Sequence, residues 1–346
     1  MAHYFESGFV VREKAWHGLA KVLTDAPATS AEAIRAAGLD WTVELAPCYA
    51  DVNGERVALP DTRATVRTVY SLDGVRVEHL GTVGDRYVPL QNRDAFQFFD
   101  PMIQSGEASY ETAGSLRGGR VVWILARLNS IGEARVGTRD GDTVRPYLLL
   151  STSHDGTRAT ACQFSPIRVV CWNTLSASYR AENASNVRRV KHTKGAADRL
   201  SAIRATIDTA RADFSRMADA WAEMQRFRLP DSPAARAEIV RAYARLTFAP
   251  EAKAAEALAG GPDAVRRMEP VRAEADIWRL LHRGPGADSA GATAFGLLQA
   301  ATHYVDHEQG RDADSRLASS WTGAGANYRQ RATDRALALI GAGGGA

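Results

Sequence analysis

The hydrophobic pattern of this chain changes its period near residue 173, and that change restricts the folds open to it. Between Trp41 and Leu150, apolar residues tend to alternate with polar ones, which is the pattern of strands with one buried face. Beyond Asn173 they recur every three or four positions, as on one side of a helix. We therefore expect an α+β fold, with an antiparallel, strand-rich N-terminal half and a helical C-terminal half packed against it.

Turn residues divide the strand-rich half into hairpins. We expect segment 108–116 to pair with 120–128, and segment 145–151 to pair with 157–163. Gly118-Gly119 in the first connection supplies the positive φ that a tight turn needs. The second connection contains Asp155-Gly156, and Asp-Gly is a strong hairpin signal.

Capping residues and helical periodicity predict the helices. Ser30 and Asn92 are each expected to cap a short helix, whereas residues 7–20 predict a loop-rich entry. A long amphipathic helix is expected over residues 193–228. We expect residues 1–192 to form a sheet domain with helices, residues 193–340 a helical region packed on it, and residues 341–346 a disordered tail.

Composition limits the possible functions. The chain has 346 residues and a formal net charge of only +3, so an argument for nucleic-acid binding must rest on local charge. The cysteines Cys48, Cys162 and Cys171 form no Cys-x-x-Cys pair, which argues against a disulfide framework and a thiolate zinc site. Neither a phosphate loop nor a dinucleotide fingerprint is present, so we expect no cofactor.

The sequence carries no targeting signal that we can identify. Its N-terminus has neither the basic nor the apolar region of a signal peptide, and no apolar run reaches the roughly 18 residues that a membrane helix needs. We expect a cytoplasmic protein that does not bind membranes.

The segment from Ile167 to Thr174 resembles a strand that leads into a helix. Alternation would put Cys171 on one face and Arg168 on the other, and Asn173 would cap the helix. Cys171 is then expected to be a packed core thiol, because a free cysteine behaves as a small hydrophobe. The alternative is an enzyme without a cofactor, in which Cys171 is a thiolate nucleophile, His154 is its base, and Asp155 and Asn173 orient the histidine.

Arg168 alternates with apolar residues, so its charge must reach water, a carboxylate or a phosphate. We expect a structural ion pair, with contact to a ligand as the alternative.

A basic segment follows, which we define as residues 180–204. Its cationic residues are Arg180, Arg188, Arg189, Lys191, His192, Lys194, Arg199 and Arg204. Only Glu182 and Asp198 oppose them, and Trp172 and Tyr179 precede them. Positive charge beside aromatic residues suits single-stranded nucleic acid, since the charge follows the backbone while bases stack. The alternative is a solvated surface loop.

His303 and His307 are four residues apart, a spacing compatible with metal binding on a helix. A zinc-protease helix would carry Glu directly after the first histidine, where this chain has Tyr304. We therefore predict no metal site and keep the two histidines as candidates; a polar helix end is the alternative.

Several blocks of the sequence together resemble the uncharacterised phage/plasmid-like protein family. The main block joins the turn His154-Asp155-Gly156-Thr157 to the run Arg168-Val-Val-Cys-Trp-Asn-Thr-Leu175. Further matches are 81–87, 111–116, 191–193 and 319–325. Thr157 and Ser165 stand where the family pattern has Ser and Thr, and both exchanges keep a hydroxyl group.

This resemblance implies an accessory protein of phages or plasmids and supplies no biochemical activity. Together with the basic segment it favours single-stranded DNA binding, with a role in recombination, replication or strand annealing and a possible homo-oligomer. Arg168 and the basic segment are the expected contacts. The alternatives are the enzyme with a His154/Cys171 site and a structural or host-interaction protein that counters host defence.

Overall fold

The computed structural model describes residues 5–12, 20–71, 74–157, 160–168, 173–174, 187–189, 196–310 and 324–343. They form two compact units that interleave along the chain. The first contains residues 1–131, 147–164 and 187–208, and the second contains 132–146, 165–186 and 209–346. The division falls within the strands β9 and β10 and within the helix α4, whose bounds are given below.

The first unit contains most of a large sheet. Its strands are β1 (Phe5–Val11), β2 (Lys21–Leu23), β6 (Ala108–Leu116), β7 (Val121–Leu128), β9 (Thr143–Ser153), β10 (Ala161–Arg168) and β12 (Val187–Arg189). Their order is β10-β9-β7-β6-β1-β2, and β12 pairs with β10. The hairpin of β6 and β7 is confirmed, with Arg117, Gly118 and Gly119 all at positive φ.

The large sheet is buried along almost the whole of its central strands. Nearly every residue of β6 and β7 is inaccessible, including Tyr110, Trp123 and Leu125. This explains why β7 contains a continuous apolar run, from Val121 to Ala126, instead of a strict alternation. Strand β1 includes residues 7–11, where we expected a loop-rich entry over residues 7–20, so this expectation is corrected for Ser7–Val11.

Three short helices belong to the first unit: α1 (Ser30–Ala36), α2 (Asn92–Gln97) and α3 (Asp100–Gln104). The cap of α1 is Thr29, whose hydroxyl accepts a hydrogen bond from the Glu32 amide, and Ser30 is the first helical residue. Asn92 does not cap α2 either. It is the first residue of that helix, and its side chain makes the buried contacts described below.

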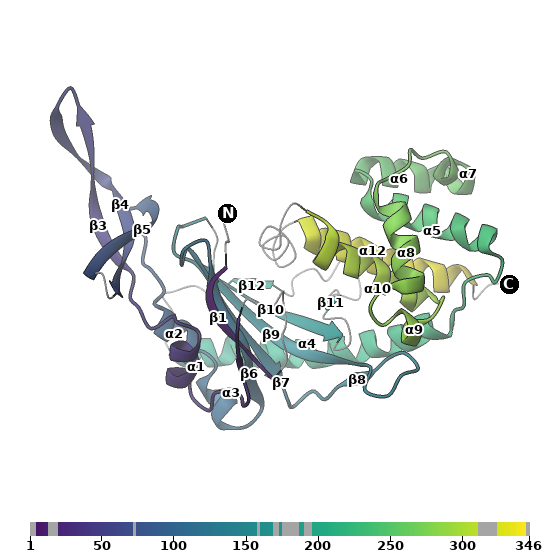
Figure 1. The fold of residues 1–346 in the computed structure, drawn as a ribbon, viewed down its shortest axis with the longest axis horizontal. Coiled ribbons are helices and arrows are strands. Elements are labelled where there is room, and N and C mark those ends of the chain that lie inside the picture. Colours follow the sequence, from purple (N-terminus) through teal and green to yellow (C-terminus); the bar gives the residue numbers. More distant parts are fainter. Residues whose placement is uncertain are drawn as a thin grey trace. The chain divides into compact units, whose positions relative to one another are not determined.

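A second, smaller sheet also belongs to the first unit (Figure 1). We call it the small sheet; it consists of β3 (Glu44–Val52), β4 (Glu55–Ser71) and β5 (Gly74–Gly84), with β4 in the centre. Arg67 attaches one face of the small sheet to the rest of the first unit. It forms ion pairs with Glu6 of β1 and Glu78 of β5 and lies over the ring of Trp41. The hydrogen bond from Arg67 lowers the pKa of the Glu78 carboxyl group, which keeps Glu78 ionised.

The second unit is mainly helical. Its helices are the later part of α4 (Ala196–Arg226), α5 (Pro233–Phe248), α6 (Glu251–Ala259), α7 (Gly261–Arg266), α8 (Ala273–Arg283), α9 (Ala287–Ala290), α10 (Ala294–His303), the π-helix η3 (Tyr304–Glu308) and α12 (Ala324–Gly343). Helix α10 contacts α8, α12 and α9 (Figure 1). Nearly all of α10 is buried, including Phe295 and Leu297, so it forms the centre of this core.

The second unit also holds β8 (Ala134–Arg135), which pairs with the start of β9, and β11 (Asn173–Thr174), which pairs with the end of β10. The strand assignment of Asn173 corrects our expectation of a helix cap there. Asn173 lies opposite Arg168 in an antiparallel pair, so it belongs to a strand.

The predicted α+β class is confirmed: the N-terminal half is rich in antiparallel strands, and the C-terminal half is helical. The predicted helix over residues 193–228 corresponds to α4. None of the helices that the structure describes is both long and apolar enough to cross a membrane.

Candidate functional site

His154 lies at the end of β9 in a buried polar cluster. Its side chain is completely buried, and its Nε2 atom is 2.9 Å from Oδ1 of Asn92. Asn92 in turn donates from Nδ2 to the Leu39 carbonyl oxygen at 3.0 Å. The amide oxygen of Asn92 is therefore an acceptor, which assigns the proton of this contact to Nε2 of His154. The indole of Trp41 packs edge-on against the imidazole.

Burial and these contacts fix His154 in one orientation. A general base must reach the proton that it removes, and a completely buried imidazole reaches only its neighbours within the core. Cys171, its expected partner, lies outside the described residues, so the enzyme hypothesis stays a prediction. On β10, Cys162 is fully buried, and burial raises the pKa of its thiol to about 12. Cys162 is therefore a neutral core thiol near pH 7.

Asp155 shapes the turn that follows His154. Its Oδ1 accepts hydrogen bonds from the Thr157 amide at 3.0 Å and from the Thr157 hydroxyl at 2.6 Å. Gly156 has a φ of +72°, and the backbone of Asp155 lies so close to Gly81 that a side chain at residue 81 would overlap it. These contacts confirm the interpretation of Asp155 and Gly156 as turn-forming residues.

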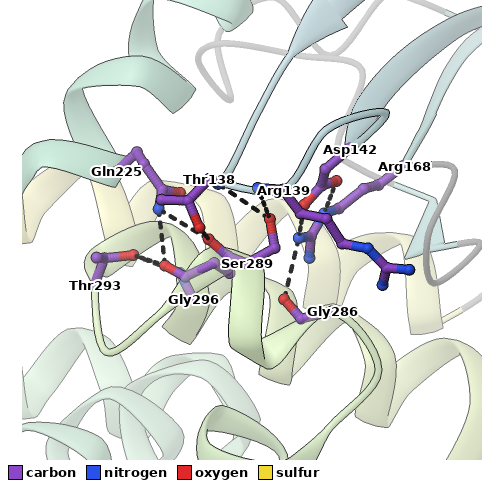
Figure 2. Close-up of polar contacts among 10 residues, drawn as sticks. Thr138, Arg139, Asp142, Arg168, Gln225, Gly286, Ser289, Thr293 and Gly296 are labelled. Atoms are coloured by element: carbon purple, nitrogen blue, oxygen red, sulfur yellow. Dashed lines mark hydrogen bonds and ion pairs between the residues drawn. The ribbon is translucent and has the colours of Figure 1, made fainter.

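Arg168, at the end of β10, forms a buried ion pair with Asp142 in the second unit (Figure 2). Its Nε donates to Oδ1 of Asp142 at 2.8 Å, and one terminal nitrogen donates to Oδ2. The same nitrogen donates to the Gly286 carbonyl oxygen at 3.2 Å. The guanidinium also lies 5.3 Å from the centre of the Phe295 ring.

These contacts decide between the two roles expected for Arg168. Both members of the ion pair have completely inaccessible side chains. The expected structural ion pair is confirmed, and the inclusion of Arg168 among the nucleic-acid contacts is corrected. Its charge is already satisfied by a bidentate carboxylate, and a phosphate has no access to it.

The loop that carries Asp142 is held to α9 by hydrogen bonds between side-chain hydroxyl groups and the backbone (Figure 2). The hydroxyl oxygen of Ser289 accepts from the amides of Thr138 and Arg139, at 3.1 and 3.0 Å. The Thr138 hydroxyl donates back to the Ser289 carbonyl oxygen. A side chain at Gly137 would overlap both Ser289 and Asp142, so this position requires glycine. The network therefore positions Asp142 for Arg168.

The structure describes only part of the basic segment. Arg188 and Arg189 lie in β12, opposite Cys162 and Ala161 of β10. Arg199 and Arg204 lie in α4. The remaining candidates, Arg180, Lys191, His192 and Lys194, lie outside the described residues.

His303 and His307 lie near each other where α10 continues into η3, with ring centres 4.4 Å apart. Burial lowers the pKa of His303 to about 4, with further contributions from His307 and Arg279. Nearby Asp306 forms an ion pair with Arg329. Within the described residues, no group of at least three His, Cys, Asp or Glu side chains is arranged to hold a metal ion.

Sequence reasoning missed the partners of the expected residues. Asp142 follows Asp140-Gly141 and has the pattern of an ordinary turn, so only the fold brings it to Arg168. Asn92 has the pattern of a helix cap, and nothing near it in the sequence indicates His154. The ion pairs of Arg67 were likewise not expected, because Glu6 lies 61 residues away in the sequence.

The protein is thus an α+β protein with two buried polar clusters, one around His154 and one around Arg168. Its basic segment includes β12, which pairs with β10 of the large sheet. The chain belongs to the family described as Domain of unknown function (DUF932), whose model matches residues 79–334. Searches of the curated proteins and of the solved structures found no match. The family match covers the signature from His154 to Leu175 and says nothing of a phage or plasmid setting.

Proposed function

We propose that this protein binds single-stranded nucleic acid through its basic segment. The observation that carries the proposal is the local charge of residues 180–204. Seven of them are Lys or Arg and two are acidic, which gives a net charge of +5. The whole chain carries only +3, so the remaining residues together carry −2. Such separation of charge attracts a polyanion to one part of a chain that is otherwise slightly acidic.

The position of the basic segment in the fold supports this proposal. The segment includes β12, which pairs with β10 of the large sheet, and the first turns of α4. Because the backbone is regular at both places, less chain entropy is lost when these parts of the segment bind a flexible strand. With Arg168 buried, the proposed contacts are those of the basic segment alone.

A preference for single strands follows from the aromatic residues that precede the segment. Trp172 and Tyr179 are the nearest upstream rings in the sequence. Exposed bases of a single strand can stack on such rings, and bases within a duplex cannot. We propose DNA as the ligand in preference to RNA, because the sequence resembles phage/plasmid-like proteins.

That resemblance also suggests a biological setting. We propose that the protein is a phage or plasmid accessory protein acting in recombination or replication, with strand annealing as the most concrete version. Annealing requires that two strands be held at once, which a homo-oligomer with one basic segment per subunit could do.

The test is fluorescence anisotropy with the full chain and labelled oligonucleotides at low salt. The variant neutralises four cations: Arg188→Gln, Arg189→Gln, Lys191→Gln and Lys194→Gln. We expect the wild-type protein to bind a single strand more tightly than a duplex of the same length, and the variant to lose at least about tenfold in affinity.

A matched control removes the same amount of charge elsewhere. Arg241, Lys253, Arg267 and Arg283 are exposed cations in the second unit, and the control variant changes all four to glutamine. We expect its affinity to stay within about twofold of the wild-type value, because these cations lie outside the basic segment that is proposed to contact the phosphates. Equal losses in both variants, or no binding by the wild-type protein at micromolar concentration, would overturn the proposal.

A further inference from the structure

Exposed apolar side chains are concentrated in the small sheet. Within the described residues, eight of the eleven large hydrophobic residues that are strongly exposed lie in β3, β4 and β5. They are Leu45, Tyr49, Val52, Val57, Leu59, Tyr70, Val75 and Val77. Single exposed apolar residues are ordinary on a protein surface, but a concentration of them in one small sheet indicates a contact surface.

The strand register shows which face of the sheet is bare. Tyr70 lies opposite Val75, and Thr68 lies opposite Val77, so these side chains share one face. Tyr70, Val75 and Val77 are 79%, 65% and 66% exposed. The opposite face carries Arg67, which is held by Glu6 and Trp41. One face is therefore anchored to the rest of the first unit. The other face carries an exposed apolar strip, which consists of Val75 and Val77 in β5 and Tyr70 in β4.

The two edges of the small sheet differ in how they are protected. Strand β3 contains Pro47 and an irregular register directly after it, both of which hinder pairing with a further strand. Strand β5 pairs with β4 in a regular register from Val75 to His79 and contains no proline there. Its two charged residues, Arg76 and Glu78, are of opposite sign and form an ion pair within one copy, so they do not repel a second β5 strand as a run of like charges would. Exposed edges of this kind are usually covered in a working protein.

The residues of this edge are complementary to themselves. In an antiparallel pair related by a twofold axis at Val77, Arg76 of one copy lies opposite Glu78 of the other, and Val77 lies opposite Val77. The two pairs of Arg76 with Glu78 therefore join opposite charges on one face of the sheet. The pair of Val77 residues joins apolar side chains on the other face. An axis at Arg76 or at Glu78 would instead place like charges opposite each other, which is unfavourable.

We propose that the protein forms a homodimer in which the β5 strands of two copies pair antiparallel about Val77. The small sheets of the two copies then form one continuous sheet. Val75, Val77 and Tyr70 of both subunits form an apolar strip on one of its faces. Two Arg76–Glu78 pairs on the other face set the register. This dimer is independent of nucleic acid, so its test is separate from that of the basic segment.

The first experiment measures the mass of the purified full chain by light scattering during gel filtration, without nucleic acid, at tens of micromolar protein. We expect a mass of twice the 37.4 kDa of the chain. The variant Val77→Lys should be monomeric and folded, because Val77 is largely exposed within one copy and two lysines would oppose each other in the dimer. A monomeric wild-type protein, or a dimeric Val77→Lys variant, would overturn the proposal.

A second experiment tests the register through disulfide formation in a Cys48→Ser background. Residues directly opposite in an antiparallel pair have Cα atoms about 4.5–5.5 Å apart, which permits a disulfide. Val77→Cys should therefore cross-link two chains on mild oxidation. The control Val75→Cys should not, because the two copies of residue 75 are then four positions apart along the strands, roughly 13 Å. Equal cross-linking of both variants would contradict this register.

Discussion

At the scale of single residues, two polar members of the family signature, His154 and Arg168, are completely buried. His154 is enclosed with Asn92 and Trp41, and Arg168 is enclosed with Asp142. A buried polar side chain that is satisfied by fixed partners specifies the fold around it, and it has no access to a substrate. We therefore assign Arg168 a structural role and propose nucleic-acid binding for the basic segment, while the enzyme hypothesis for His154 stays a prediction.

The need for glycine at residue 137 gives a first prediction. Gly137→Ala combines a φ of +70° with overlap of the new methyl group against Ser289 and Asp142. Gly141→Ala is the matched control, since its φ is +79° but no atom lies within 4 Å of the added carbon. We expect Gly137→Ala to lower the free energy of unfolding by about 1–3 kcal/mol more than the control does. Equal urea midpoints for the two variants would show that the overlap is relieved at no cost.

His303 gives a prediction for the pH dependence of stability. Burial lowers its pKa to about 4 in the folded state, against about 6.5 in the unfolded chain. Between these pH values the unfolded chain binds a proton that the folded protein does not, so stability is lost as the pH falls from about 6.5 to about 4. Urea unfolding at pH 7 and pH 5 should show this loss in the wild-type protein. His303→Gln should show a smaller loss, and an identical loss would exclude His303 as the cause.

At the scale of elements, the buried pair of Arg168 and Asp142 links three parts of the second unit. Arg168 comes from the end of β10, Asp142 from the loop between β8 and β9, and the Gly286 carbonyl from the residue before α9. The pair therefore connects a strand end to a loop and to the start of a helix. Its loss is expected to affect all three elements together.

We predict that Arg168→Met lowers the free energy of unfolding by about 3–5 kcal/mol, because it leaves Asp142 charged, buried and without its cation. The double variant Arg168→Met with Asp142→Leu removes both charges, so it should recover a substantial part of that loss. Urea denaturation followed by tryptophan fluorescence measures both effects. A single variant as stable as the wild-type protein would show that water or another group compensates for the lost cation.

Periodicity and turn residues were sufficient to predict most elements. The hairpin of β6 and β7 was predicted because Gly118-Gly119 supplies the positive φ of a tight turn between two expected strands, and α4 because its apolar residues recur with helical spacing. Strand β1 was missed because its apolar run, Phe9-Val10-Val11, is short and does not alternate. Asn173 was assigned wrongly because a local capping preference was outweighed by strand pairing with Arg168.

The candidate site was less predictable than the fold, for a physical reason. Alternation predicted that the charge of Arg168 needs a partner, but the partner, Asp142, is defined only by the folded path of the chain. The exposed edge of β5 was also not recognised, because an alternating strand has the same sequence pattern whether or not its apolar face is covered.

At the scale of the whole molecule, positive charge is concentrated in one part of the chain. The basic segment carries a net charge of +5 and the remaining residues −2. A protein that binds a polyanion through such a segment releases counterions, so its affinity falls steeply as salt is added. Binding through the bases alone would be much less sensitive to salt.

The most direct test of this claim is the slope of log K against log salt concentration for single-stranded DNA. The slope is about −0.7 for each phosphate that a cation contacts. We predict a steep slope for the wild-type protein. For the variant with glutamine at Arg188, Arg189, Lys191 and Lys194, we predict a slope shallower by up to about 3. The same slope for both proteins would contradict the assignment of nucleic-acid binding to the basic segment.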